Sequence, residues 1–183
     1  KVSATKKGPV AKGRFPYDKS QLEAIFKSPI FTGCKSAARR SEPGDQIIRD
    51  GKYWVPIVGI YSGLRLGEIV QLLGKDIKQE EGIHYFDVCK EEGEVKKIKS
   101  GSSYRRVPVH RRLVELGFLD HVAKVLPDQR LFEDIAMGHD SSFSHNFSKF
   151  WGRYVDQIGA KTPKTTFHSF RHNFKDALVH TGV

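Results

Sequence analysis

The spacing of apolar residues changes twice along this chain of 183 residues, and that change limits the folds open to it. Between Ile83 and His110 the chain runs in short segments rich in β-branched and aromatic residues, separated by glycine and serine, as strands do. On either side, apolar residues recur every three or four positions, as they do on helices. We therefore predict an α+β fold, mainly helical, with a small three-stranded antiparallel sheet formed by segments 83–90, 94–100 and 103–110.

Capping and breaking residues predict where the helices begin and end. Asp18, with Gln21 three residues later, predicts the start of a short helix that Pro29 closes. A long loop should follow to about Gly51, and then a buried helix with Pro56 in its first turn. Glycines predict the ends of that helix and of the next one. Further helical segments are expected at 66–73, 111–126, 131–134, from Ser141 or Ser142 onward, and 166–180.

Length and composition indicate one main domain with a basic surface. A linker rich in Lys, Gly and Pro is predicted over residues 1–14, and one domain over residues 15–183. The 31 Lys and Arg residues exceed the 21 Asp and Glu residues, giving a formal charge of +10 that attracts polyanions, so nucleic acid is the expected partner. No apolar run is long enough to span a membrane. Cys34 and Cys89 lack the spacing of a zinc site or a disulfide framework, which fits a cytoplasmic protein.

The last predicted helix separates apolar from cationic residues. One arc should face the core; it contains Phe167, Phe170, Phe174, Ala177 and Leu178. The neighbouring arc is cationic and contains His168, Arg171, His172 and Lys175. Clustered positive charges favour a bound anion, and a planar guanidinium suits phosphate oxygens. The alternative is that the two histidines are neutral residues at the edge of the core and that Arg171 is a solvated charge.

Three segments decide between these interpretations, because they occur together and in a fixed order. They are SGLRLGEI (62–69), KIKSGSSYRRVPV (97–109) and HSFRH (168–172). With them, the chain from about Phe15 onward resembles the tyrosine recombinase, or phage integrase, family, and most of all the integrases of prophages and integrative elements. The resemblance implies site-specific DNA recombination by strand cleavage and rejoining through a covalent 3′-phosphotyrosine intermediate.

The resemblance also implies a role for each matching residue. Arg65 and Arg171 would bind the scissile phosphate, His168 would help take the proton of the nucleophile, and Lys99 would protonate the leaving 5′ oxygen. Glu68, one turn after Arg65, is expected to pair with that arginine, and His172 to pack beside the site. The remaining basic residues of these segments are expected to contact the DNA backbone without reading its sequence: Lys96, Lys97, Arg105, Arg106 and Lys175.

Because two guanidinium groups can stabilise the transition-state charge, we expect no metal and no cofactor. The family's nucleophilic Tyr should follow HSFRH, whereas all six tyrosines precede it, so the chain is expected to be a fragment that binds double-stranded DNA without cleaving it. Full-length family members act as tetramers on DNA. Three other classes stay open: a non-catalytic DNA-binding module with this fold, a metal-dependent phosphoesterase, and a structural protein with a basic surface.

Overall fold

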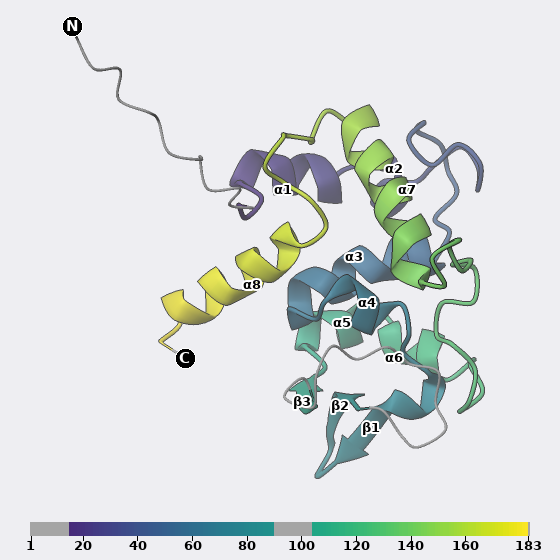
Figure 1. Ribbon diagram of the computed structural model, residues 1–183, viewed down its shortest axis with the longest axis vertical. Helices are drawn as coiled ribbons and strands as arrows, with labels where there is room; N and C mark the ends of the chain where they lie inside the picture. The colour runs from purple at the N-terminus through teal and green to yellow at the C-terminus, as the bar shows by residue number, and fades with distance from the viewer. Residues whose placement is uncertain (1–14, 90–103, 183) are drawn as a thin grey trace, which may run out of the picture.

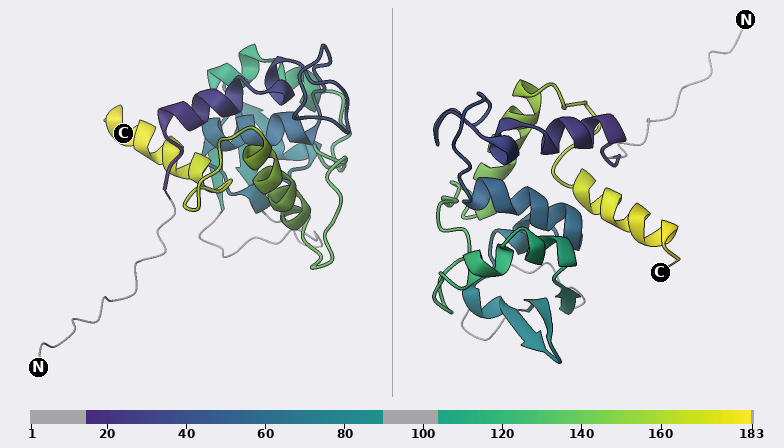
Figure 2. Two further views of the ribbon diagram at one scale, coloured as in Figure 1. Left: turned by 90° about the horizontal axis from the view of Figure 1, so that it is seen from above. Right: turned by 180° about the vertical axis from the view of Figure 1, so that it is seen from behind.

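The computed structural model describes residues 15–89 and 104–182, and the helix α3 (Gly51–Ser62) lies at its centre (Figure 1). Nine of its twelve residues are buried, as expected of a helix that is apolar on all sides. The last helix, α8 (Ser169–His180), packs against it. The sheet lies at one end of the molecule and α1 (Lys19–Phe26) lies towards the other (Figures 1 and 2).

The predicted start of α1 is confirmed. The backbone N–H of Gln21 donates to the Asp18 carboxylate at 2.8 Å, and the Gln21 side chain accepts from the backbone N–H of Asp18 at 3.0 Å. The following loop is shorter than predicted, because Pro29 begins a second helix, α2 (Pro29–Thr32), instead of only ending the first. The loop after α2 is tied to α3 by an ion pair between the buried Arg40 and Asp50.

The prediction that Pro56 lies in the first turn of α3 is wrong. The Asp50 carboxylate caps the helix by accepting from the backbone N–H groups of Lys52 and Tyr53, so the helix begins earlier and Pro56 lies inside it. A proline there has no N–H to donate, which removes one bond of the helical ladder. Burial of nearly every α3 side chain compensates for that loss. The predicted end is confirmed, since Gly63 caps α3 in the left-handed conformation.

The predicted three-stranded antiparallel sheet is confirmed, with one strand different. Its order is β1 (Ile77–Glu80), β2 (Ile83–Val88) and β3 (Arg105–Pro108). Phe86 of β2 is opposite Ile77 on one side and Val107 on the other. The sequence did not predict β1, because its four residues, IKQE, show no apolar alternation. The predicted strand 94–100 lies outside the described residues.

Of three predicted helical segments, one is shorter in the structure, one is interrupted and one is not helical. The helix expected over 66–73 ends at Ile69, as α4 (Leu66–Ile69). The backbone groups of Leu72 and Gly74 bond instead to the 129–131 segment, and Gly74 begins the 3₁₀ turn η1 (Gly74–Asp76). Gly117, with φ of 83°, separates α5 (Arg111–Glu115) from α6 (Phe118–Val122). Segment 131–134 forms turns, whereas α7 (Phe143–Gln157) begins after Ser142 as predicted.

Aromatic side chains join α1, α3, α7 and α8 into one core. The ring of Phe170, on α8, is fully buried and lies 5.0 Å from Tyr17 and 5.5 Å from Trp151, between ring centroids. The Trp151 indole N–H donates to the Tyr17 hydroxyl at 3.0 Å. These contacts hold the beginning of α8 against the rest of the domain.

Candidate active site

Arg65 lies at the turn between α3 and α4, where the predicted ion pair with Glu68 is present. An Arg65 guanidinium nitrogen, Nη1, is 2.7 Å from Oε1 of Glu68, and the backbone N–H of Arg65 donates to Oε2 at 2.8 Å. The Arg65 side chain is 40% exposed, whereas that of Glu68 is 7% exposed. Glu68 therefore holds both the backbone and the side chain of Arg65 while leaving part of the guanidinium accessible.

A second arginine, Arg105 at the start of β3, grips the same carboxylate. Its Nη2 is 2.8 Å from Oε2 of Glu68 and its Nη1 is 3.2 Å from Oε1, a bidentate geometry. Burial raises the pKa of the Glu68 carboxyl, but the hydrogen bonds from Arg105 and Arg65 outweigh it and hold that pKa below its usual value. Glu68 is therefore an anion at neutral pH.

Arg171 reaches the same turn from α8. Its guanidinium donates to the carbonyl oxygen of Gly63, two residues before Arg65. Burial lowers the pKa of the Arg171 guanidinium, and repulsion by Arg65 and then by Arg105 lowers it further, while Glu68 acts in the opposite direction. An arginine stays protonated even so. The structure thus brings together three guanidinium groups, which with the Glu68 carboxylate carry a formal charge of +2.

Gly63 makes this convergence possible. Its φ of 61° suits glycine, and a Cβ added there would collide with the ring of Phe174 on α8. Gly67, the other glycine near this turn, has no comparably close neighbour. The backbone of Gly63 therefore sets the close approach of α8 to the Arg65 turn.

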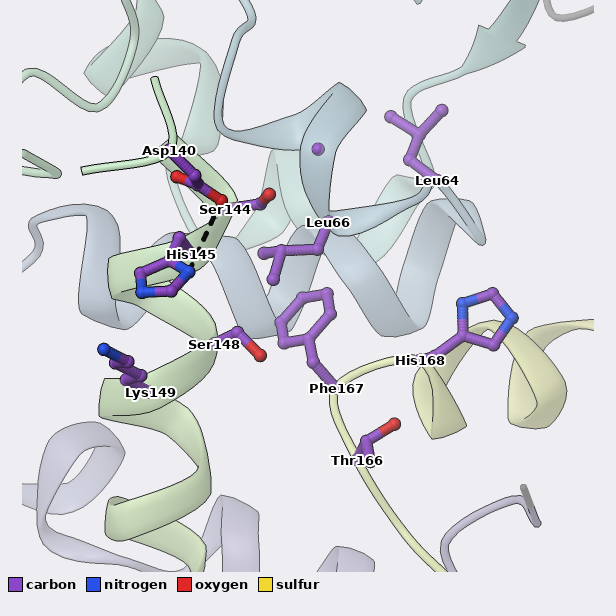
Figure 3. Close-up of a pocket in the computed structure, with 11 residues that line it drawn as sticks. Leu64, Leu66, Asp140, Ser144, His145, Ser148, Lys149, Thr166, Phe167 and His168 are labelled. Atoms are coloured by element: carbon purple, nitrogen blue, oxygen red, sulfur yellow. Dashed lines mark ion pairs between the residues drawn. The ribbon is translucent and has the colours of Figure 1, made fainter. Parts of the chain in front are cut away.

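His168 and His172 lie at the start of α8, and their ring centroids are 5.1 Å apart, edge to face. His168 also lines an open pocket of about 580 Å³ beside the Arg65 turn (Figure 3). Leu64, Leu66 and Gly67 line the pocket from that turn. Its polar wall comes from Asp140, which pairs with His145, from α7 and from Thr166. Its hydroxyl and ammonium groups are those of Ser144, Ser148, Lys149 and Thr166. The pocket thus adds both hydrogen-bond donors and one carboxylate beside the Arg65 turn.

The residues predicted to contact DNA differ in their surroundings. Arg106 and Lys175 are exposed, as such a role requires. Arg105, predicted to belong with them, instead contacts Glu68. The sequence contains a signal for this difference, because side chains alternate along a strand and Arg105 shares its face with Val107. Three predicted site residues, Lys96, Lys97 and Lys99, lie outside the described residues.

Five of the six tyrosines pack against other side chains. Tyr17, Tyr53, Tyr85 and Tyr154 are buried, and Tyr61 stacks on His110 with ring centroids 4.8 Å apart. Burial raises the pKa of Tyr17 to about 12, although the hydrogen bond from Trp151 lowers it in part. Tyr104 is half exposed. A phenol as hard to ionise as that of Tyr17 is a poor nucleophile.

In residues 15–89 and 104–182, no group of three or more His, Cys, Asp or Glu side chains is placed to bind a metal ion. The same ranges contain no helix with the length and apolar character needed to cross a bilayer. What the described site offers is a cluster of guanidinium groups, a nearby imidazole and a polar pocket, an arrangement that can bind and polarise a phosphate diester.

Comparison with solved structures identifies the fold. The chain superposes on the XerA recombinase with a TM-score of 0.57 and 16% sequence identity, over 98% of this chain and 54% of that one. It superposes on the XerH site-specific recombinase, bound to its palindromic difH substrate in a post-cleavage complex, with a TM-score of 0.58 and 20% identity, over 97% and 46%. The chain shares the fold of these recombinases.

A further structure with the recombinase fold is the Tn1549 transposon integrase in complex with circular intermediate DNA. Its TM-score is 0.59 with 19% identity, over 97% of this chain and 57% of that one. The chain thus spans about half the length of these recombinases. No protein-family model matches the sequence, and no curated protein matches it either. The likeness therefore lies in the recombinase fold at low sequence identity.

Proposed function

We propose that the chain is the catalytic domain of a site-specific DNA recombinase of the integrase type. The observation that carries the proposal is the meeting of Arg65 and Arg171 at one turn: Arg171 bonds to the carbonyl of Gly63, and the charge of Arg65 lowers its pKa. Two guanidinium groups that are fixed at the same turn suit one phosphate diester better than they suit an extended polyanion. The XerH recombinase is bound to its difH substrate and the Tn1549 integrase to circular intermediate DNA, which supports duplex DNA as the substrate.

In the proposed reaction, Arg65 and Arg171 hold the non-bridging oxygens of the scissile phosphate. A tyrosine outside residues 1–183 attacks the phosphorus, His168 takes the phenolic proton, and the bond to the 5′ oxygen breaks. Lys99 gives a proton to that oxygen, which is a poor leaving group without it. The products are a 3′-phosphotyrosine and a free 5′ hydroxyl. Negative charge that grows on the phosphate oxygens is stabilised by guanidinium groups already in position.

The position of His168 supports its assignment as the proton acceptor. It lies directly before α8, three residues before Arg171, and it lines the polar pocket beside the Arg65 turn. The rings of His168 and His172 meet edge to face, which supports a packing role for His172. An imidazole titrates close to neutral pH, so it can take and return a proton under cellular conditions.

Substitution of Arg171 tests the proposal in the full-length protein. On a nicked duplex that traps the covalent intermediate, Arg171→Ala should slow single-turnover cleavage about 10²–10³-fold, the usual cost of losing one transition-state donor. Duplex affinity should change little, because it is spread over many basic contacts. Lys175→Ala is the matched control, since Lys175 is an exposed cation one turn further along the same helix.

Cleavage at the normal rate by Arg171→Ala would contradict the proposal and favour the rival function, a non-catalytic DNA-binding module. The 183-residue chain offers a second test. It should bind duplex DNA with an affinity that falls steeply with salt, and it should form no covalent adduct on a nicked duplex. An adduct would show that the nucleophile lies within these residues. Affinity that is equal at low and moderate salt would contradict the DNA-binding role.

A further inference from the structure

Two neighbouring arginines of β3 have different surroundings. Both nitrogens at the end of the Arg105 side chain contact Glu68, at 2.8 and 3.2 Å, and that side chain is 29% exposed. Arg106 points to the opposite face of the strand, pairs with Glu80, and is 60% exposed. Arg106 also lies over the Tyr85 ring, 4.9 Å from its centroid. A residue that contacts the DNA backbone should resemble Arg106, so Arg105 needs a different explanation.

Glu68 accepts four hydrogen bonds from the described residues, and Arg105 supplies two of them. The other two come from the backbone N–H and the guanidinium of Arg65. A carboxylate can accept about four such bonds, so Glu68 is fully occupied only when both arginines are present. The carboxylate is nearly buried, and its side chain joins the β3 strand to the Arg65 turn across 37 residues of sequence.

Charge gives Arg105 a second effect on Arg65. With Arg105 present, Glu68 is shared by two cations, and the cluster with Arg171 has a net charge of +2. Without Arg105, Arg65 alone would face the carboxylate, and the net charge of the cluster would fall to +1. An incoming phosphate would then compete with Glu68 for Arg65 in a partly buried place, where charges interact strongly.

We propose that Arg105 is a positioning residue: by holding Glu68 from β3, it keeps Arg65 fixed and available for the scissile phosphate. This inference rests on the proposed function of the cluster. Arg105 acts through Glu68 and takes no proton, and it is distinct from the exposed cations that bind the DNA backbone. Preorganised supporting contacts of this kind keep a reactive geometry within fractions of an ångström.

The test compares Arg105→Gln with Arg106→Gln in the full-length protein. Single-turnover cleavage at saturating nicked duplex reports the chemical step, and the salt dependence of binding reports backbone contacts. Arg105→Gln should slow cleavage about 10–100-fold, as loss of a supporting contact does elsewhere, with the salt slope unchanged. Arg106→Gln, in contrast, should weaken duplex binding and lower the salt slope by about 1.

A double-mutant cycle with Glu68→Gln sharpens the result. If the two residues act as a unit, Glu68→Gln/Arg105→Gln should cleave no slower than the slower single variant. Should Arg105→Gln fail to fold, Arg105→Lys carries the same comparison, with slower cleavage at unchanged affinity as the expected result. If the folded Arg105 variant cleaved at the wild-type rate and had a lower salt slope, while Arg171→Ala still cleaved slowly, the inference would be overturned and the proposed function would stand. If Arg171→Ala also cleaved normally, the proposed function itself would fail.

Discussion

The two halves of α8 carry similar residues but have different surroundings. In the first half, Phe170 is fully buried and Arg171 is bonded to the carbonyl of Gly63. In the second half, Leu178 is 37% exposed and Lys175 is exposed on the same face as Arg171, one turn away. The C-terminal end of α8 projects past α3 (Figures 1 and 2). Leu178 lines an open groove at that end.

This contrast separates two uses of positive charge that look the same on a helical wheel. A guanidinium held by the backbone of another element can only bind at one place, so it suits a single phosphate. A free ammonium adds to the field that attracts the whole duplex. We therefore expect specific chemistry to depend on the first half of α8 and on the turn that it meets, and general affinity to depend on residues such as Lys175.

Phe170→Ala should produce the largest loss of stability. Its ring is fully buried among Tyr17, Trp151 and Phe167, and removing such a ring commonly lowers the free energy of unfolding by about 3–5 kcal/mol. Leu178→Ala, in the exposed half of the helix, should change it by no more than about 0.5 kcal/mol. Urea unfolding of both variants measures the difference. Equal losses would show that the two halves are packed alike.

Glu68→Gln should have an intermediate effect that depends on pH. Neutralising Glu68 leaves Arg65, Arg105 and Arg171 without their shared anion and should lower the free energy of unfolding by about 1–3 kcal/mol at neutral pH. The folded-state pKa of Glu68 is depressed, so its contribution is complete above the unfolded-state pKa of about 4.3 and is lost as the pH falls through the folded-state value.

The difference in stability between the wild type and Glu68→Gln should accordingly be constant near neutral pH and should shrink under acidic conditions. Thermal unfolding followed from pH 7 downward, at fixed salt, measures it. Asp128→Asn is a suitable control, because its carboxylate is exposed in its pair with Lys75. A difference that grew as the pH fell would contradict the ion-pair arrangement.

Lys175→Gln should have the smallest effect. Because the side chain is exposed and belongs to the open half of α8, stability should change by less than about 0.5 kcal/mol. Duplex affinity should fall uniformly across DNA sequences, and the salt slope should fall by about 1. Binding titrations at several salt concentrations measure both quantities. A strong dependence on one DNA sequence would instead indicate a base contact by Lys175.

Local rules predicted the parts of the fold that depend on neighbours in sequence. The Asp18 cap, the end of α3 at Gly63 and the pairing of Arg65 with Glu68 each involve residues within a few positions of one another. The buried positions of Phe167 and Phe170 followed from helical periodicity. The fold class followed from the change of period near Ile83, because that change marks where helices give way to strands.

The remaining features depend on contacts between distant segments, which periodicity does not contain. Arg105 and Glu68 are 37 positions apart, so nothing local distinguished Arg105 from Arg106 except the alternation along β3. The helical wheel placed Ala177 and Leu178 in the core arc, but both are exposed, because no other element among residues 15–89 and 104–182 covers that part of α8. Helical periodicity shows which face of a helix is apolar, but it does not show which element, if any, packs against that face.

The most direct test of the central claim is a crystal structure of the full-length protein on a duplex that contains its recombination site. We predict one phosphate diester whose non-bridging oxygens lie within hydrogen-bond distance of both Arg65 and Arg171, with the Glu68 bridge to Arg105 intact. Two guanidinium groups bound to different phosphates, or an Arg171 still occupied by the Gly63 carbonyl with no phosphate beside it, would contradict the account.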